Sequence, residues 1–178
     1  MGMTQLDPAR TALVLIDLMP RIVGQPLAPR PGSAVVDAAL TLAAASREAG
    51  APVVAVRVER PGVAEQPPGS ELVEAVAAVA DEIVVKRSIG GFYGTGLHES
   101  LQRRGVDTLA FAGIATNLGV ESTARAASDH GYELVFVEDA MAAVTIEEHQ
   151  AAVTLDFPRF GEVTTCAELQ WRKDADAA

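Results

Sequence analysis

The sequence is poor in cysteine, histidine and basic residues. Its 178 residues include one cysteine, Cys166, and three histidines scattered along the chain. A single cysteine excludes an internal disulfide and a cysteine-built metal site, and the histidines lack metal-ligand spacing. Lysine and arginine together number 14 against 24 acidic residues, so the net charge is −10. Such a surface repels polyanions, and we expect no nucleic-acid partner, no metal and no other cofactor.

Long apolar runs are also missing. No segment approaches the roughly 18 apolar residues that suggest a membrane-spanning helix. Residues 1–8 contain neither the basic region nor the apolar region of a secretory signal. We therefore expect a soluble, cytoplasmic protein whose partner is a small-molecule substrate and not a membrane.

Aromatic residues make up only 4% of the chain, although 49% of its residues are hydrophobic. The apolar residues are mostly alanine, valine and leucine, which suits thin helices packed closely on a parallel sheet. The length is sufficient for one compact core without disulfides or metal staples. We expect one domain over residues 1–172 and a frayed tail over 173–178.

Strand-like and helix-like runs alternate along the chain. The expected strands are residues 11–17, 52–58, 82–86, 107–113, 133–139 and 162–165. The expected helices between them include 33–49, with Ser33 as N-cap and Gly50 after its end, together with 95–104 and 117–130. Short right-handed crossovers then predict a single-domain, three-layer αβα fold of the α/β class, with a doubly wound, mostly parallel six-stranded sheet.

Two loops rich in proline and glycine, residues 24–32 and 60–69, are long for simple strand–helix links. They are candidates for lids or subunit contacts. Ordered surface loops without a role are the alternative.

Ligands of doubly wound sheets bind beyond the carboxyl ends of the strands, where three charged residues stand out. Asp17 ends the first apolar strand and needs a partner if it is buried, or else it caps a helix or loop. Lys86 ends the third strand, and its stem could bring an ammonium to Asp17, although a solvated strand end is the alternative. Arg57 lies inside the second strand and requires an anion from the protein or from a substrate.

The segment 113–127 follows the apolar run 108–112. This pattern is typical of a buried strand, a tight turn and the first turns of a helix, whose free N–H groups point back toward the turn. Such a turn is suited to bind an anion. Asn117, just before the expected helix, is its expected N-cap, with a site role as the alternative.

These fragments together resemble the isochorismatase-like hydrolase superfamily, also called the cysteine hydrolases. The resemblance covers nearly the whole chain in order and spacing, and is carried by residues 12–18, 85–95, 113–127 and 137–141. It implies a Rossmann-like fold in which Asp17 and Lys86 take the places of the family's catalytic aspartate and lysine. It also implies a cis peptide between Ile114 and Ala115, which would aim the Ala115 and Gly119 N–H groups at one oxygen.

The sequence departs from the family pattern at Gly119, where the resemblance places the nucleophilic cysteine. Glycine cannot form a covalent acyl intermediate. Cys166 lies beyond the last expected strand and is no substitute. The resemblance then implies the branch that cleaves enol ethers, in which an aspartate transfers a proton to the vinyl carbon and water completes the hydrolysis.

Acid chemistry at Asp17 faces two opposed effects. An ammonium within about 4–6 Å lowers a carboxyl pKa by roughly 1–3 units, whereas desolvation raises it. The sequence leaves the direction open. For a substrate carboxylate, Arg57 and Arg87 are the nearest predicted cations, while Phe92 and Tyr93 are either packing residues or pocket walls.

We therefore expect a hydrolase that acts without a covalent intermediate on a small, anionic substrate, with enol-ether hydrolysis favoured. Amide or ester hydrolysis by a water that Asp17 activates is one alternative. A catalytically silent scaffold that binds a metabolite is another. The resemblance also favours a homo-oligomer, either a dimer or a larger assembly.

Overall fold

Six parallel strands form the central sheet of the computed structural model, which describes residues 2–172. Their spatial order is β4-β3-β2-β5-β6-β7. In sequence order the strands are β2 (Thr11–Ile16), β3 (Val53–Val58), β4 (Glu82–Lys86), β5 (Thr108–Ile114), β6 (Glu133–Ala142) and β7 (Glu162–Thr164). The six-stranded parallel sheet predicted from the sequence is confirmed, with strand ends shifted by up to three residues.

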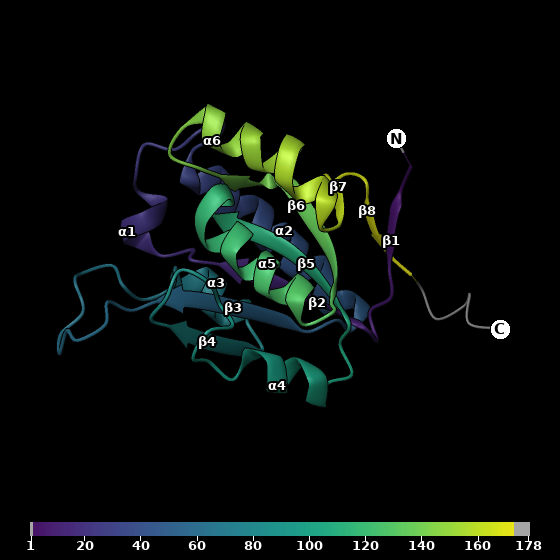
Figure 1. The fold of residues 1–178 in the computed structure, drawn as a ribbon, viewed down its shortest axis with the longest axis horizontal. Coiled ribbons are helices and arrows are strands. Elements are labelled where there is room, and N and C mark those ends of the chain that lie inside the picture. The colour runs from purple at the N-terminus through teal and green to yellow at the C-terminus, as the bar shows by residue number, and fades with distance from the viewer. Residues whose placement is uncertain (1, 173–178) are drawn as a thin grey trace.

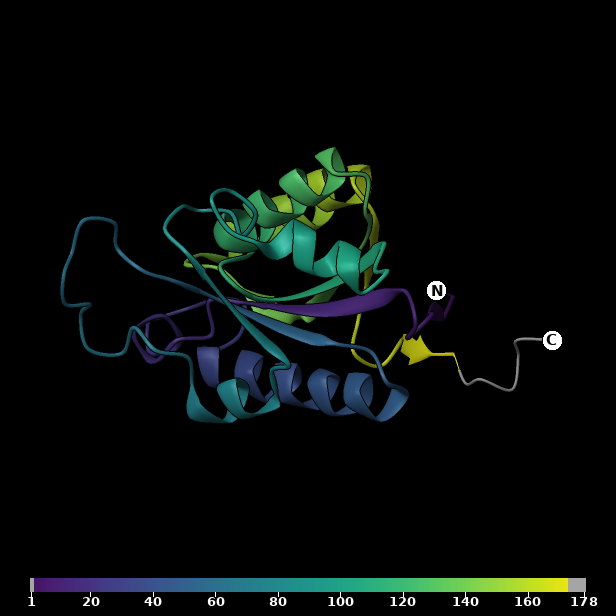
Figure 2. The same ribbon diagram turned by 90° about the horizontal axis from the view of Figure 1, so that it is seen from below.

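Helices cover both faces of the sheet, which gives three layers (Figure 2). One face carries α2 (Gly32–Ala49) and α3 (Glu74–Val79). The other carries α4 (Leu97–Arg103), the π-helical turn η1 (Thr116–Val120), α5 (Glu121–Asp129) and α6 (Ile146–Ala151), which continues through η2 (Ala152–Asp156) into the short η3 (Phe157–Arg159). Among the described residues, no helix is long and apolar enough to cross a membrane.

Each face of the sheet has its own apolar core. Along β2 every residue is buried, with Leu13 and Leu15 facing α2 and Val14 and Ile16 facing α5. Strands buried on both faces show continuous apolar runs and no alternation, as the sequence does here. The few aromatic residues concentrate on the α5 side, where the rings of Phe136 and Phe157 stack with centroids 3.9 Å apart. Small side chains elsewhere let the helices lie close to the sheet.

A second, two-stranded parallel sheet joins the two ends of the described chain. It consists of β1 (Thr4–Leu6) and β8 (Leu169–Trp171). Sequence analysis did not predict these strands because each has only three residues, too few to show a periodic pattern. The predicted domain 1–172 contains both strands, and the tail 173–178 lies outside the described residues.

The start of α2 differs from the prediction. Ser33 lies inside the helix, and the N-cap is Pro31, whose φ of −66° and extended ψ place it just before the first turn. Position 32 requires glycine, because a Cβ atom there would lie only 2.8 Å from the carbonyl carbon of Val23, the last residue of α1 (Pro20–Val23). The predicted end is confirmed: Gly50 has φ 85°, a conformation that favours glycine.

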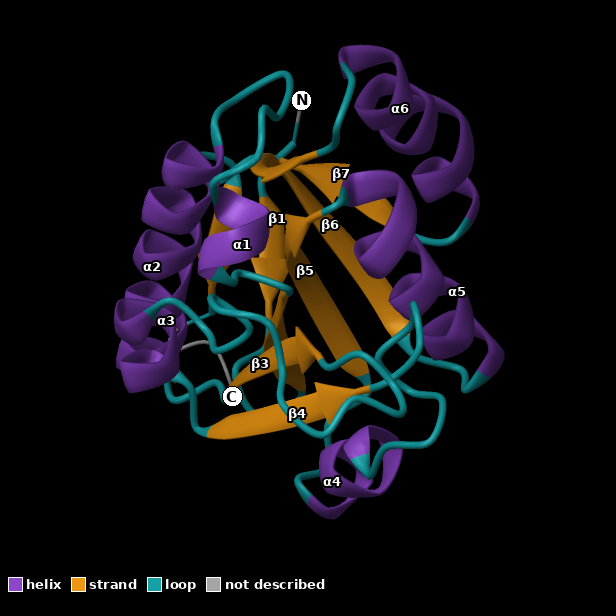
Figure 3. Cartoon of the chain, turned by 90° about the vertical axis from the view of Figure 1, so that its left-hand side faces the viewer, coloured by secondary structure: helices purple, strands orange, loops and turns teal. Residues whose placement is uncertain are grey.

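The order of the strands places the topological switch point between β2 and β5, where successive crossovers run in opposite directions. The arrowheads of β3 and β4 in Figure 1 mark the carboxyl edge of the sheet, and Figure 3 shows this edge facing the viewer. The chain that follows β3 extends outward from the same edge, as two views agree (Figures 1 and 2). A ligand site is expected at this edge.

Candidate active site

An ion pair between Asp17 and Lys86 lies at the carboxyl edge of the sheet. Asp17 follows β2 directly, and Lys86 is the last residue of β4, paired in register with Val58 of β3. The lysine stem therefore reaches across one intervening strand, and its Nζ lies 2.8 Å from Asp17 Oδ2. The two side chains are only 1% and 8% exposed, and Lys86 Nζ also donates to the Ile89 carbonyl oxygen. The structure thus brings together the two residues that the sequence singled out.

The backbone of Asp17 adopts a left-handed conformation, with φ 53°. Among the described residues no other non-glycine residue has positive φ. Its N–H donates to the Val56 carbonyl at 2.8 Å and its carbonyl accepts from Met19 N–H, so neighbouring backbone holds it in place. Such conformations cost about 1–3 kcal/mol and cluster at functional sites, which supports a role for the carboxylate beyond packing.

Burial raises the pKa of Asp17 above its usual value, more than the adjacent Lys86 ammonium and the more distant Arg21 lower it. Asp17 Oδ2 is held by Lys86, whereas the buried Oδ1 has no partner within the described chain. An unpartnered oxygen on a carboxyl group with raised pKa suits proton exchange with a bound molecule.

The turn after β5 forms the opposite wall of the site. The Ile114–Ala115 peptide is cis, and η1 begins at the next residue. Gly119 lies within η1 and faces the ion pair: a Cβ atom there would lie 2.9 Å from Asp17 Oδ2 and 3.3 Å from Lys86 Nζ. Position 119 therefore lies directly beside both charged groups.

A cavity of about 470 Å³ opens at the Asp17–Lys86 pair and is bounded by Ala115 and Gly119. Apolar side chains supply much of its wall: Ile22, Leu27, Val58, Pro61, Ile89, Ile114, Leu118 and Val144. Both proline- and glycine-rich loops contribute, the first through Leu27 and the second through Pro61. The volume and the mixed lining suit a small organic molecule.

Four of the five predicted substrate contacts, Asn117 among them, lie outside this cavity. Arg57 forms an ion pair with Glu59, its Nη2 lying 2.8 Å from Oε1, which is the structural alternative considered for it. Phe92 is buried with its ring centroid 5.3 Å from that of His130, and Tyr93 is 83% exposed. Phe92 is therefore a packing residue and Tyr93 a solvent-exposed residue, and neither forms a wall of the cavity.

Arg87 does line the cavity, but its Nη2 lies 2.7 Å from Glu59 Oε2. Glu59 thus joins two guanidinium groups, and those of Arg57 and Arg87 lower the pKa of its carboxyl. Arg87 therefore meets the cavity as a cation that already has a counter-charge.

Asn117 is not the helix N-cap that the sequence predicted. The helical turn begins earlier, at Thr116, with Ala115 in the capping position. Asn117 also lies outside the cavity lining, and its buried Oδ1 has no partner within the described chain. A π-helical turn replaces the expected α-helical start, and no side chain caps it.

Cys166 lies away from the cavity. Its backbone N–H donates to Asp139 Oδ1 at 2.8 Å, beside the middle of β6. Burial, reinforced by Asp139, raises the pKa of the thiol to about 12. A thiol in this environment stays protonated at neutral pH.

A residue that sequence reasoning missed, Arg21, lines the cavity beside Asp17. It belongs to α1, a helix of four residues that is too short for a periodic pattern. Its spacing from Asp17 was the available signal, since a residue four positions past a strand end lies at the same edge of the sheet.

A buried polar chain supports the turn from behind. Thr116 Oγ1 lies 2.8 Å from Nδ1 of the buried His149, whose Nε2 lies 3.5 Å from Glu138 Oε2. Arg30 Nη1 donates to the Glu138 and Met141 carbonyls, and its Nη2 lies 3.6 Å from Glu138 Oε2. Burial, followed by the nearby Arg30, lowers the pKa of His149.

Replacing His149 with leucine should lower the free energy of unfolding by about 1–3 kcal/mol at about pH 7.5, because Thr116 loses its buried partner. The lowered pKa means that, as pH falls below about 6.5, the unfolded wild-type chain binds a proton before the native state does. Acidification therefore destabilises wild type but not His149→Leu. The difference between their free energies of unfolding should be smaller at about pH 5.5 than at about pH 7.5. Urea denaturation at both pH values measures it.

Thr116→Val is the matched control, since it removes the same hydrogen bond and leaves the histidine in place. It should lose a similar amount of stability at the higher pH and keep the wild-type pH dependence. A His149→Leu deficit that stays constant or grows on acidification contradicts the assignment.

Comparison with known proteins agrees with this fold. The Isochorismatase domain profile matches residues 11–168. The chain is 39% identical over 184 aligned positions to the uncharacterized isochorismatase family protein YecD of Escherichia coli O157:H7, covering 94% of this chain and 98% of the relative. An isochorismatase family protein from Burkholderia thailandensis superposes with a TM-score of 0.82 at 34% identity, covering 94% and 97% of the two chains. The chain belongs to the isochorismatase family.

A relative with an assigned activity is the maleamate amidohydrolase of Pseudomonas putida. It is 29% identical over 177 aligned positions, which cover 88% of this chain and 83% of the relative. The family therefore includes hydrolases of amides.

Proposed function

We propose that this protein hydrolyses a small, anionic metabolite by acid–base chemistry without a covalent intermediate. The observation that carries the proposal is the state of Asp17: one carboxyl oxygen is held by Lys86 at 2.8 Å, and the other has no partner. Burial raises the pKa of Asp17, so this carboxyl group takes up a proton more readily than an exposed aspartate does. Its carboxyl group also lines the cavity, where a substrate can meet it.

Hydrolysis of an enol ether needs one proton donor and one water. Asp17 transfers its proton to the vinyl carbon, and the adjacent carbon becomes an oxocarbenium ion. Water adds to that carbon while the Asp17 carboxylate takes the proton from the water. The resulting hemiketal releases the alcohol and leaves a carbonyl product, and Asp17 is again protonated. Lys86 fixes Oδ2 and stabilises the transient carboxylate.

The environment of position 119 supports a mechanism without a thiolate. Gly119 provides no nucleophile, and Asp17 and Lys86 already occupy the space beside it. The Cys166 thiol lies outside the cavity with a raised pKa. We infer that water is the nucleophile.

Hydrolysis of an amide or ester by a water that Asp17 activates is the second candidate. It is favoured by the amidohydrolase among the relatives. In that reaction the Ala115 and Gly119 N–H groups would serve the oxyanion. A metabolite-binding scaffold without turnover is the third, but it gives no reason for a strained aspartate beside a buried lysine.

Asp17→Asn tests the function directly. The amide keeps an oxygen for Lys86 and loses the transferable proton, so turnover should fall by about 10²–10⁴-fold. The measurement is kcat/KM on separate panels of enol ethers and of amides and esters, with circular dichroism to show that the variant is folded.

Asp37→Asn makes the same chemical change on the exposed side of α2 and should keep the wild-type rate. An unchanged rate in folded Asp17→Asn would refute the proposed chemistry. Wild-type turnover of amides alone would move the assignment to the second candidate, and no turnover on either panel would favour the scaffold.

A further inference from the structure

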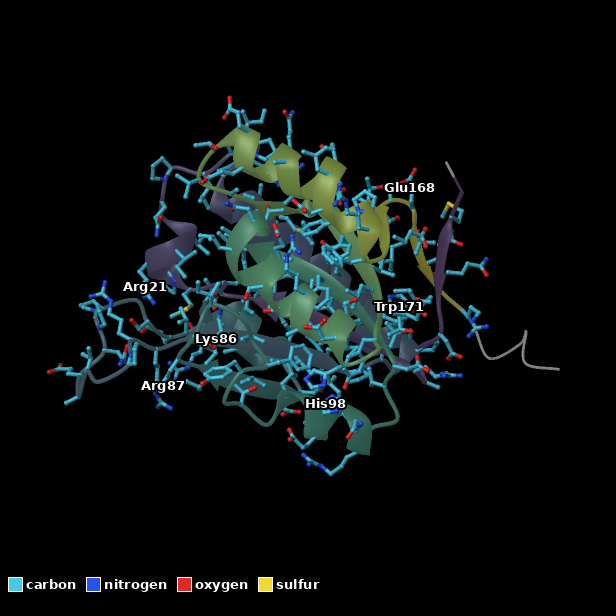
Figure 4. All side chains as sticks on the ribbon, viewed as in Figure 1. Arg21, Lys86, Arg87, His98, Glu168 and Trp171 are labelled. Atoms are coloured by element: carbon cyan, nitrogen blue, oxygen red, sulfur yellow. The ribbon has the colours of Figure 1, made fainter. Side chains whose placement is uncertain are left out.

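The cavity carries a charge opposite to that of the whole protein. Four cationic side chains line it, Arg21, Arg60, Lys86 and Arg87, against two carboxylates. The cavity therefore has two positive charges in excess within a chain of net charge −10. Figure 4 shows three of these cations, Arg21, Lys86 and Arg87, at the same end of the sheet. A local excess of this kind attracts an anionic ligand.

Two of the four cations have counter-charges within the protein. Lys86 pairs with Asp17, and Arg87 pairs with Glu59. Arg60 is exposed, so water solvates its charge. Arg21 is the remaining cation: it is partly buried and forms no ion pair within the described residues.

The guanidinium of Arg21 has donors to spare. Within residues 2–172 no carboxylate lies within 4.0 Å of it, and its Nη2 donates to the Val58 carbonyl at 3.4 Å. Its Nε is inaccessible to solvent and has no hydrogen-bond partner in the described chain. A guanidinium offers five N–H donors, and leaving buried ones unmatched is costly. Because Arg21 lines the cavity, its terminal N–H groups can donate to an acceptor bound there.

We propose that Arg21 is the anion subsite of this cavity and binds the carboxylate of a ligand that has a compact apolar body. The inference rests on the proposed function only in identifying that ligand with the substrate. A carboxylate matches the planar fork of a guanidinium with two parallel hydrogen bonds. The apolar walls, which include Ile22, Leu118 and Val144, would enclose the rest of the molecule.

The nearby carboxylates favour a singly charged ligand group over phosphate. Asp17 and Glu59 both line the cavity, and a phosphate dianion would face both of them. Glu59 also explains why Arg57 and Arg87 are poorer subsites, since it already neutralises them. Arg21 therefore takes the role that the sequence assigned to those two arginines.

Binding of benzoate and of acetophenone tests the subsite, because the two molecules have nearly the same shape and differ in charge. Isothermal titration should give benzoate a Kd of about 1 mM or tighter. Acetophenone should bind at least about 10-fold more weakly. Arg21→Gln should abolish this preference and Arg21→Lys should retain part of it. Thermal melts check that each variant is folded.

Arg103→Gln is the matched control. It removes the same charge from an exposed residue of α4 that has no ion pair in the described chain, and it should keep the preference for benzoate. Equal binding of the two molecules to wild type, no benzoate binding, or undiminished preference in Arg21→Gln would each overturn the inference. Tighter binding of inorganic phosphate than of benzoate would overturn the choice of carboxylate.

The titration does not depend on turnover. Failure of the Asp17→Asn assay would refute the proposed chemistry and leave the Arg21 result standing. Conversely, if wild type does not prefer benzoate but Asp17→Asn loses turnover as expected, the Arg21 subsite is refuted and the proposed chemistry stands.

Discussion

Replacing Lys86 with methionine should lower the free energy of unfolding by about 3–5 kcal/mol at about pH 8. Methionine fills a similar volume but leaves the Asp17 carboxylate buried without its paired ammonium, and it removes the donor to the Ile89 carbonyl. Breaking one partner of a buried ion pair costs more than removing both. Urea denaturation followed by circular dichroism measures the loss.

The loss should become smaller on acidification. Burial already raises the pKa of Asp17, and removal of the ammonium raises it further. A group whose pKa is higher in the folded state contributes stability that is lost as pH rises through that folded pKa. In the variant, Asp17 takes up a proton at a higher pH than in wild type and becomes neutral, so the stability deficit of the variant shrinks as pH falls.

The double variant Asp17→Asn/Lys86→Met separates charge from packing. It removes both charges together, and we expect it to lie within about 2 kcal/mol of wild type. If Lys86→Met is as stable as the double variant at about pH 8, an unpaired Asp17 carboxylate does not destabilise the fold, and the prediction is wrong.

Replacing Gly113 with alanine should lower the free energy of unfolding by more than about 4 kcal/mol or leave no soluble protein. Gly113 has φ 130° and lies beside Ile16 in the register of β2 and β5. An alanine Cβ would lie 2.7 Å from the Ile16 nitrogen and 2.9 Å from its carbonyl carbon. These are backbone atoms of the central strand, so they cannot move aside cheaply. Soluble yield and urea denaturation measure the effect.

Gly131→Ala is the control that measures the cost of positive φ without a steric contact. Gly131 has φ 85°, and nothing lies within 4 Å of a Cβ placed there. Its cost should be about 1–2 kcal/mol, the strain of a left-handed alanine. Similar losses in the two variants would show that the contact with Ile16 is relieved by small shifts.

Much of the sheet could be predicted because its strands are continuous apolar runs. The strand β4 was predicted at its observed bounds, and the ends of the others differ by one to three residues. The short elements α1, β1 and β8 were missed because three or four residues hold no periodic signal. Helix starts were also missed, since Pro31 and Ala115 supply no side-chain cap.

The pairing of Asp17 with Lys86 was predictable because both residues lie at strand ends, and strand ends meet at one edge of a parallel sheet. The proposed anion subsite was not predictable, because the sequence does not show which arginine the fold places beside a carboxylate. Arg57 meets Glu59, and Arg21 meets no carboxylate within residues 2–172. Pairing of this kind depends on side-chain positions that no sequence pattern records. Assembly into a homo-oligomer stays a prediction.

The place of β2 in the sheet has a consequence for how the chain is made. This strand is buried on both faces, and it pairs with β3 on one side and with β5 on the other. During synthesis β2, β3 and β4 leave the ribosome before β5. Until β5 follows, the edge of β2 that pairs with β5 is uncovered. Such an edge is a template for pairing with other chains. The amino-terminal half is therefore open to pairing with other chains until β5 covers this edge.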